Sequence, residues 1–346
     1  MTQFFIWTGK LVANLFIILM ILLGSLWLID LIPLSHQDIR QLHQENLEQI
    51  ESSGFAPINE KPIFYFAVRI SKKQESSFFW PSLVWNGRNN LFHHTLGSYL
   101  KGDFGISQVD STAVEKKVFT AMIWTLSLQI PALLIIFMLA YFIAFKWVQT
   151  KNTNHKKFIS ALLIILHSMP GFWIAGLLIY FFSIYLNWLP ASFIQVADLN
   201  PITIWLQYPV YFIFPLLSLV LPGIAMVTIL LRSGFEWSTT RPFWWRALST
   251  GISLKSGLNA EAKPHALLGL TGWMSGILPA MISGSVLIEN IFLIPGLGRL
   301  VLTSIGQRDW SVVLFVILMT SLLSIASILL SNRFHEYWDP REKPLV

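Results

Sequence analysis

The sequence contains no cysteine, and only 12% of its 346 residues are charged. The absence of cysteine excludes disulfide frameworks, thiolate metal sites and cysteine nucleophiles. Charged residues usually make up about a quarter of a globular protein. The composition therefore excludes a disordered chain, an ordinary soluble domain and a soluble nucleic-acid-binding protein, despite the net charge of +6.

Sequence motifs that carry catalytic chemistry are also missing. The chain has no G-x-x-x-x-G-K-[ST] phosphate loop, no H-E-x-x-H zinc motif and no G-x-S-x-G nucleophile elbow. His167 is the sole titratable group in the centre of an apolar run, and no carboxylate stands there to form a proton relay with it. We therefore expect no catalytic residue, metal site or cofactor-binding site, and any energy for uphill transport must come from elsewhere.

Long runs without Asp, Glu, Lys or Arg are abundant. Crossing a bilayer core takes roughly 20 apolar helical residues, and six charge-free runs reach about that length: 11–29, 118–145, 158–197, 199–231, 264–288 and 310–332. The third run is long enough to include a turn at Asn187-Trp188-Leu189-Pro190. The first run exceeds the apolar core of a cleaved signal peptide, so it is interpreted as a retained span.

These runs predict an all-α integral membrane protein with six transmembrane helices, because unpaired backbone groups are not tolerated in lipid and the runs are too uniformly apolar for barrel strands. The first helix is expected within 1–30. The other five belong to a core transmembrane domain over 119–333. Their expected ranges are about 119–145, 158–187, 209–231, 266–288 and 310–332.

The distribution of Lys and Arg predicts the orientation. Thirteen basic residues flank the runs on the side of the N-terminus, whereas the two short loops on the opposite side hold only Arg299 and Arg308. Basic residues gather on the cytoplasmic side of a membrane, so both termini are expected to be cytoplasmic. The segment 31–118 is then external, and the loop 232–265 and the tail 334–346 are cytoplasmic.

Prolines and small residues interrupt the apolar runs. Five prolines fall inside predicted spans: Pro131, Pro170, Pro215, Pro222 and Pro279. Such prolines suit a helix bundle around a central path, although packing irregularity explains any one of them alone. Glycine and small residues at spacings of three and four between 269 and 284 favour close helix packing.

Six short motifs occur in order between about residues 100 and 343. They are Gly102-Asp103-Phe104-Gly105, the run Ser168 to Trp173, the run Asn187 to Ser192, the run Glu289 to Arg299, Arg308-Asp309-Trp310, and Asp339-Pro340-Arg341. This series resembles the permease subunits of ATP-binding-cassette (ABC) importers of the oligopeptide, dipeptide and nickel type. The resemblance implies a multi-pass protein of the bacterial inner membrane, surrounded by lipid.

The resemblance also implies partners and a cargo. A second homologous permease subunit would complete the translocation path, and an extracytoplasmic solute-binding protein would deliver the substrate. Two ATP-binding subunits would bind and hydrolyse the ATP, so the permease would have no ATPase site of its own. Peptides are the commonest cargo of the family, with nickel and other small solutes in the minority.

The loop between the fourth and fifth spans is where the family docks its ATPases through a short coupling helix. Arg232 and Gly251 keep the family's interval of nineteen residues. The coupling residues that the resemblance implies are Arg241, Arg246, Ala247, Ser249 and Gly251. Small residues would let the helix lie close in a groove, and glycine would allow a tight exit. On composition alone, a basic and aromatic helix lying in the membrane interface fits equally.

Candidate residues of the path or its gate follow from the same motifs and from the prolines: Pro170, Trp173, Pro215, Pro222, Glu289, Pro295, Gly296 and Gly298. The segment from Glu289 to Asp309 is expected at the outer mouth, where it would act as a gate. Arg299 in this segment also fits a contact with a lipid headgroup.

Two departures from the family's pattern keep other functions open. Gly269 stands where the family has a proline at the entry to the fifth span, and the stretch 252–265 carries only three charges. A non-transporting membrane scaffold therefore stays an alternative. A secondary transporter is another, although it would need an ion site in the middle of the membrane.

Overall fold

The computed structural model describes residues 17, 19–21, 23–25, 66–72, 79–85, 87, 90–196, 199–283 and 285–339. Contacts divide the chain into two compact units. Unit 1 comprises 1–116 and 307–318, and unit 2 comprises 117–306 and 319–346. Most of the predicted first helix and the tail from residue 340 onward lie outside the described residues.

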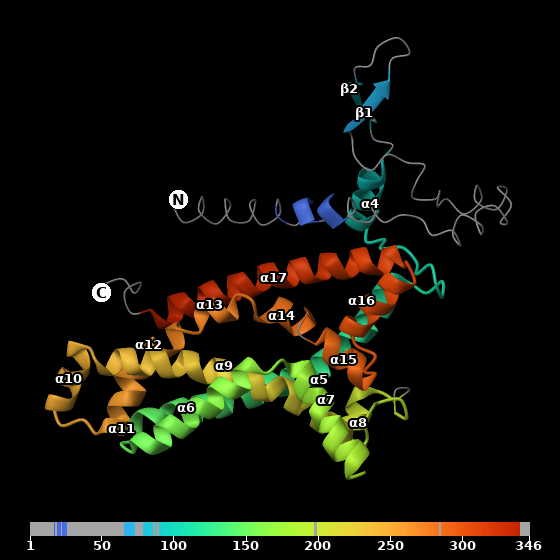
Figure 1. Cartoon of the computed structure of the whole chain (residues 1–346). Helices are drawn as coiled ribbons and strands as arrows, with labels where there is room; N and C mark the ends of the chain where they lie inside the picture. Colours follow the sequence, from blue (N-terminus) through green and yellow to red (C-terminus); the bar gives the residue numbers. More distant parts are fainter. Residues whose placement is uncertain are drawn as a thin grey trace. The chain divides into compact units, whose positions relative to one another are not determined.

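Unit 1 contains a β-hairpin, so the expectation of an all-α protein was wrong in this part of the external segment. Strand β1, Phe66–Lys72, pairs antiparallel with β2, Phe79–Trp85 (Figure 1). The sequence of β1, F-A-V-R-I-S-K, alternates larger apolar residues with small or polar ones, which is the period-two pattern of a strand. The physical signal was therefore present in the sequence, although the high apolar content of the whole chain concealed it.

Helix α4, Leu91–Leu100, follows the hairpin in unit 1. It begins at Asn90, whose side chain accepts a hydrogen bond from the His93 amide at 2.8 Å. This is an N-cap, which satisfies one of the amides that a helix start leaves without a partner. Two glycines with positive φ, Gly102 at 79° and Gly105 at 82°, turn the chain after α4 toward the next helix.

Three helices in the described part of the chain are long and apolar enough to cross a membrane. They are α5, Val114–Gln149; α9, Ile213–Thr239, taken with the preceding η2, Pro209–Phe212; and α17, Trp310–Trp338. Pro131 and Pro222 lie inside α5 and α9 without ending them. Counting each of two bent helix pairs as one span raises the number to five.

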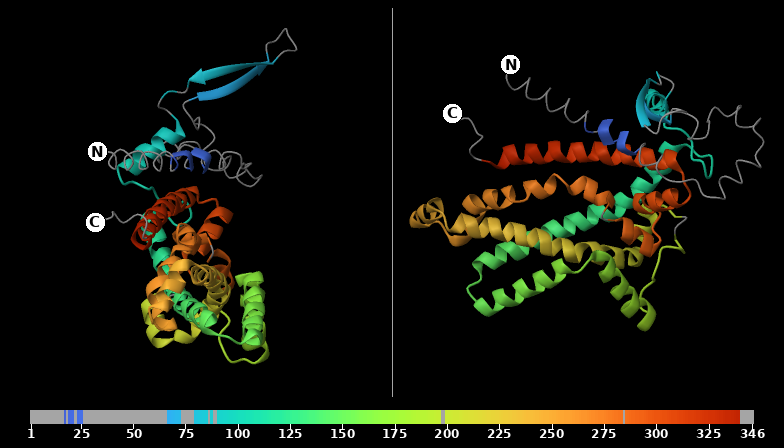
Figure 2. Two further views of the ribbon diagram at one scale, coloured as in Figure 1. Left: turned by 90° about the vertical axis from the view of Figure 1, so that its left-hand side faces the viewer. Right: turned by 45° about the horizontal axis from the view of Figure 1, so that its top comes forward.

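The predicted third span, 158–187, is one of these bent pairs and not a straight helix. Helix α6 covers Thr153–Ser168, and α7, Gly171–Leu178, continues as η1, Ile179–Tyr185. The two parts meet at 96°. Pro170 lies at the bend, where it has no amide to continue the α6 ladder. The second view in Figure 2 shows α7 turning away from the line of α6.

The region expected as a fifth span, 266–288, is divided into short helices. These are α12, Lys263–Leu268; α13, Thr271–Met274; α14, Ile277–Ser283; and α15, Val286–Phe292. Helix α16, Leu297–Gly306, then leaves at 77° to the segment that ends with α15. Gly269 and Gly276 stand at the breaks before and after α13, and glycine lowers helix propensity by about 1 kcal/mol relative to alanine.

Two apolar cores hold unit 2 together. One joins α5 and α9 with the loop helices α10, Pro242–Ser249, and η3, Leu258–Ala262, and with α12. The other joins α5, α7 and α9 with α8, Pro201–Gln207, and α15. Figure 1 shows α10 and α11, Leu254–Gly257, at the end of unit 2 where α9 ends and α6 begins. The loop helices are thus packed into one of the two cores.

Candidate functional site

Helix α10 forms the centre of the loop that sequence analysis predicted to dock ATPases. Arg241 directly precedes the helix, and its guanidinium lies 4.3 Å from the ring centre of Trp237 on α9. Trp245, Arg246 and Ser249 are exposed on α10. The helix therefore presents an aromatic ring and a positive charge to the outside, with a second positive charge at its start.

Ala247 differs from its expected place. It is buried, as is Trp244, and Trp244 belongs to the core that α10 shares with α5 and α9. A Cβ atom built on Gly257 would lie 3.1 Å from the Trp244 ring, so α11 packs closely against α10. Trp244 therefore holds α10 to its own chain, Ala247 is buried, and the predicted contact residues that stay available to a partner are Arg241, Arg246, Ser249 and Gly251.

Gly251 ends the α10 turn in a conformation that favours glycine. Its φ is 86°, and its amide donates to the carbonyl of Leu248 at 3.0 Å. No atom lies within 4 Å of a Cβ built there, so backbone conformation and not space requires glycine. The chain therefore leaves α10 through a tight turn at Gly251.

Glu289, predicted as a path or gate residue, is completely buried at the junction of α15 and α16. Its Oε1 accepts a hydrogen bond from the Thr125 hydroxyl at 2.7 Å. Its Oε2 accepts from the amides of Gly298 at 2.7 Å and Arg299 at 3.2 Å. The Leu297 amide donates to the Thr125 hydroxyl at 2.8 Å. The first amides of α16 thus have acceptors, and a negative charge stands at the positive end of the helix.

The glycines of this motif allow close packing, because Gly296 leaves room for the carboxylate and Gly298 lets α16 approach Val286 of α15. A Cβ on Gly296 would lie 2.4 Å from the carboxyl carbon of Glu289, and one on Gly298 would lie 2.5 Å from the Cα of Val286. Leu293, with a φ of 59°, ends α15 in the left-handed conformation, and Pro295 follows in the turn. The motif therefore builds a sharp helix-to-helix turn around one buried acid.

Thr125 was not identified from the sequence. It lies on α5, 164 residues from Glu289, and a single threonine in an apolar run carries no local signal. Arg299, considered as a headgroup contact, instead donates from its guanidinium to the carbonyl of Leu293 at 2.8 Å. Its side chain therefore stabilises the same turn.

A second buried acid joins two other motifs within unit 1. Asp309 directly precedes α17 and accepts hydrogen bonds from the Ser107 hydroxyl at 2.5 Å and the Gln108 amide at 3.3 Å. Phe104 lies 4.3 Å, between ring centres, from Phe315 of α17. The Gly-Asp-Phe-Gly and Arg-Asp-Trp motifs are therefore parts of one packed junction.

The other predicted path residues are not brought together at one place. Pro170 forms the bend between α6 and α7, and Trp173 is exposed on α7. Pro215 is buried in the first turn of α9, and Pro222 lies further along that helix. These four residues do not line the hollow described next.

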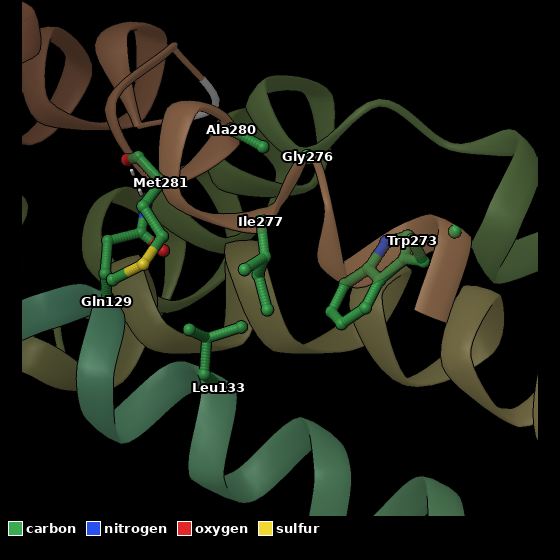
Figure 3. Close-up of a pocket in the computed structure, with 8 residues that line it drawn as sticks. Gln129, Leu133, Trp273, Gly276, Ile277, Ala280 and Met281 are labelled. Carbon is green, nitrogen blue, oxygen red and sulfur yellow. Dashed lines mark hydrogen bonds between the residues drawn. The ribbon is translucent and has the colours of Figure 1, made fainter. Parts of the chain in front are cut away.

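A hollow of about 430 Å³ lies between α5 and the broken helices α13 and α14 (Figure 3). Its walls are mostly apolar, and Gly272, Gly276 and Ala280 leave space on one side. Gln129 of α5 supplies the polar group, and its Nε2 donates to the carbonyl of Met281 at 2.9 Å. An apolar hollow with one fixed amide in the middle of a long charge-free run suits a solute contact.

Comparison with known proteins shows the family. Residues 136–344 match the family described as binding-protein-dependent transport system inner membrane component. The chain belongs to this family and is a permease subunit of an ABC importer, in the bacterial plasma membrane.

Individual relatives are moderately similar. A putative peptide transport system permease protein of Brucella abortus is 30% identical over 256 residues, which cover 73% of this chain and 76% of the relative. The peptidoglycan transport system permease protein YejB of Agrobacterium fabrum is 26% identical, with coverage of 72% and 70%. The glutathione transport system permease protein GsiC of Escherichia coli is 30% identical, with coverage of 67% and 72%.

Proposed function

We propose that this chain forms half of a translocation path for peptides and that separate ATPase subunits drive it through α10. A second homologous permease subunit supplies the other half of the path, and an extracytoplasmic solute-binding protein delivers the cargo. Two ATP-binding subunits bind and hydrolyse ATP in the cytoplasm. Their closure moves α10, and the helices then open the path alternately to each side, as a shift between two states.

The structure of the α10 loop is the observation that supports this proposal. The exposed surface of α10 offers Trp245 and Arg246, and Gly251 with its positive φ ends the turn. The opposite side of α10 is packed into the core shared by α5 and α9. A short helix that is rigidly seated on the bundle and exposed on its outer side suits the transfer of motion from a docked partner.

The peptide assignment rests on the names of the relatives and on the chemistry of the hollow. The relatives are described as transporting peptides, peptidoglycan and glutathione. The hollow offers an apolar surface of Leu133, Ile277 and Met281 with the single amide of Gln129. An apolar wall with one hydrogen-bonding group suits a peptide better than a bare divalent cation, which prefers carboxylate, imidazole or thiolate ligands.

The absence of cysteine makes a direct test of docking possible. Ser249→Cys gives a single thiol on the exposed side of α10. In membranes that contain the whole assembly, a thiol-specific photocrosslinker at this position is expected to capture an ATP-binding subunit. The same probe at Ser192→Cys, in the loop after the third span, is the control and is expected to capture none. Capture at 192 and not at 249 would contradict the proposal.

Gly251→Trp tests whether the motion of the ATPases is transmitted through α10. We expect ATP-driven uptake of a labelled oligopeptide to fall at least tenfold, because a side chain at a φ of 86° costs about 1–2 kcal/mol and displaces the exit from α10. The protein should still insert in the membrane. Unchanged uptake would favour a secondary transporter, and absence of any uptake by the wild-type assembly would favour a scaffold. Competition by unlabelled peptide and not by nickel is expected for the peptide cargo.

A further inference from the structure

A cluster of four side chains connects three helices of unit 2 at the point where α9 leaves the apolar part of the bundle. We call Trp147, Ser160, Arg232 and Glu236 the Trp147 cluster. Trp147 lies near the end of α5, Ser160 in α6, and Arg232 and Glu236 in α9. Figure 1 shows α6 alongside α9 in this region.

Trp147 is the centre of the cluster. Trp147 is only 5% exposed, although it lies two residues before the last residue of the helix. The guanidinium carbon of Arg232 lies 4.0 Å from the ring centre, and the indole Nε1 donates to Glu236 Oε1 at 2.7 Å. One ring of α5 is therefore bound to α9 through both its face and its N–H group.

Arg232 extends the connection to α6. Its Nη1 donates to the Ser160 hydroxyl at 3.2 Å, and its Nε lies 3.3 Å from Glu236 Oε1. An isolated ion pair at such spacing on an exposed helix contributes little. Here the pair also covers a buried ring and joins a third helix, so one charge-balanced group holds α5, α6 and α9 at a fixed spacing.

The cluster stands between the bundle and the loop that carries α10. Helix α9 continues from Arg232 to Thr239 without a break, a rise of about 10 Å at 1.5 Å per residue. Arg241 at the start of α10 then stacks on Trp237 of the same extension. A displacement of α10 therefore reaches the extension of α9 first, and the extension is attached to α5 and α6 at the Trp147 cluster.

We infer that the Trp147 cluster is the positioning device that transmits the motion of α10 to α5 and α6, so that the three helices move as one body. This inference rests on the proposed function, since it requires a force applied to α10 by an ATPase. Without the cluster, apolar packing alone would join the extension of α9 to α5, and movement of α10 would bend α9 at Arg232 more than it moves α5 and α6. ATP hydrolysis would then proceed without an equal amount of transport.

The test measures the amount of peptide taken up per ATP hydrolysed by the whole assembly in proteoliposomes. Trp147→Leu removes the ring face and the N–H group, and Trp147→Phe removes the N–H group alone. Glu236→Gln keeps an acceptor for the indole and removes the charge that holds Arg232. The matched control is Glu336→Gln, because Glu336 pairs with Arg333 on α17 at 3.2 Å outside the cluster.

We expect Trp147→Leu to lower uptake per ATP about tenfold, and Trp147→Phe and Glu236→Gln about threefold, with ATP hydrolysis within twofold of the wild type. Glu336→Gln should leave the ratio unchanged. An unchanged ratio in assembled Trp147→Leu would overturn the inference. A parallel loss of assembly, hydrolysis and uptake in all three cluster variants would also overturn it, because the cluster would then serve folding alone.

Three outcomes separate failure of the inference from failure of the proposed function. If Trp147→Leu fails to assemble, the uptake per ATP hydrolysed by Glu236→Gln is the test of the inference. An unchanged ratio in that variant overturns it. If the wild-type assembly shows no ATP-driven uptake, the proposed function fails and the inference fails with it. If the wild type transports and every cluster variant keeps its ratio, the inference alone fails.

Discussion

Replacing Glu289 tests whether the buried carboxylate holds the start of α16. Glu289→Ala removes the acceptor of the Gly298 and Arg299 amides and of the Thr125 hydroxyl. A buried backbone donor without a partner costs about 1–3 kcal/mol. Opening of the first turn of α16 should therefore become about 2–6 kcal/mol easier, for the two amides together.

Glu289→Gln is the graded variant. The glutamine keeps one side-chain oxygen for the two amides but loses the negative charge, and a neutral hydrogen bond is about half as strong as a charge-assisted one. We expect a loss of about 1–2 kcal/mol. Glu336→Gln, an exposed glutamate on α17, is the control and should change nothing at this junction.

Hydrogen exchange of the protein in lipid nanodiscs measures these energies, because amides exchange through local opening. A loss of 1.4 kcal/mol raises the exchange rate about tenfold. The peptide over 297–306 should therefore exchange at least about 25-fold faster in Glu289→Ala and about 5- to 30-fold faster in Glu289→Gln. A peptide from the middle of α9 should keep its rate. Unchanged protection of 297–306 in Glu289→Ala would refute the helix-capping role.

Two further predictions concern close packing and the junction in unit 1. Gly234→Ala should lower the free energy of unfolding by about 1–3 kcal/mol and lower the thermal midpoint of the purified protein accordingly, because its Cβ would lie 2.6 Å from the Cα of Ala266. The control is Gly176→Ala on α7, whose Cβ would meet no atom within 4 Å and which should have no such cost. A midpoint equally low in both variants would contradict this. Asp309→Ala removes the carboxylate that accepts from the Ser107 hydroxyl and the Gln108 amide. Proteolysis between 101 and 113 should therefore be faster in the variant. Equal cleavage of wild type and variant would show that Asp309 does not hold this loop.

Features that depend on residue type or on local backbone conformation were predictable. Charge-free runs identify membrane helices because the free energy of placing a charge in lipid depends on the side chain itself. The runs that became α5, α9 and α17 were therefore identified, within the described residues. The need for glycine at 251 follows from one residue's φ, and a family pattern places that residue without reference to the rest of the fold. The sequence shows a proline at 170, but it did not predict that the two helices there meet at 96°.

Features that depend on distant parts of the chain were decided by the tertiary structure. Glu289 in a membrane segment suggested a gate, and the fold places it against Thr125 and the amides of α16, where it ends up buried and fully hydrogen-bonded. Ala247 suggested a docking contact, and the fold buries it. Composition thus determined which segments leave water, because that preference is a property of each residue. Only packing determined which polar groups meet inside, because each buried donor or acceptor must find a partner that chain distance does not predict.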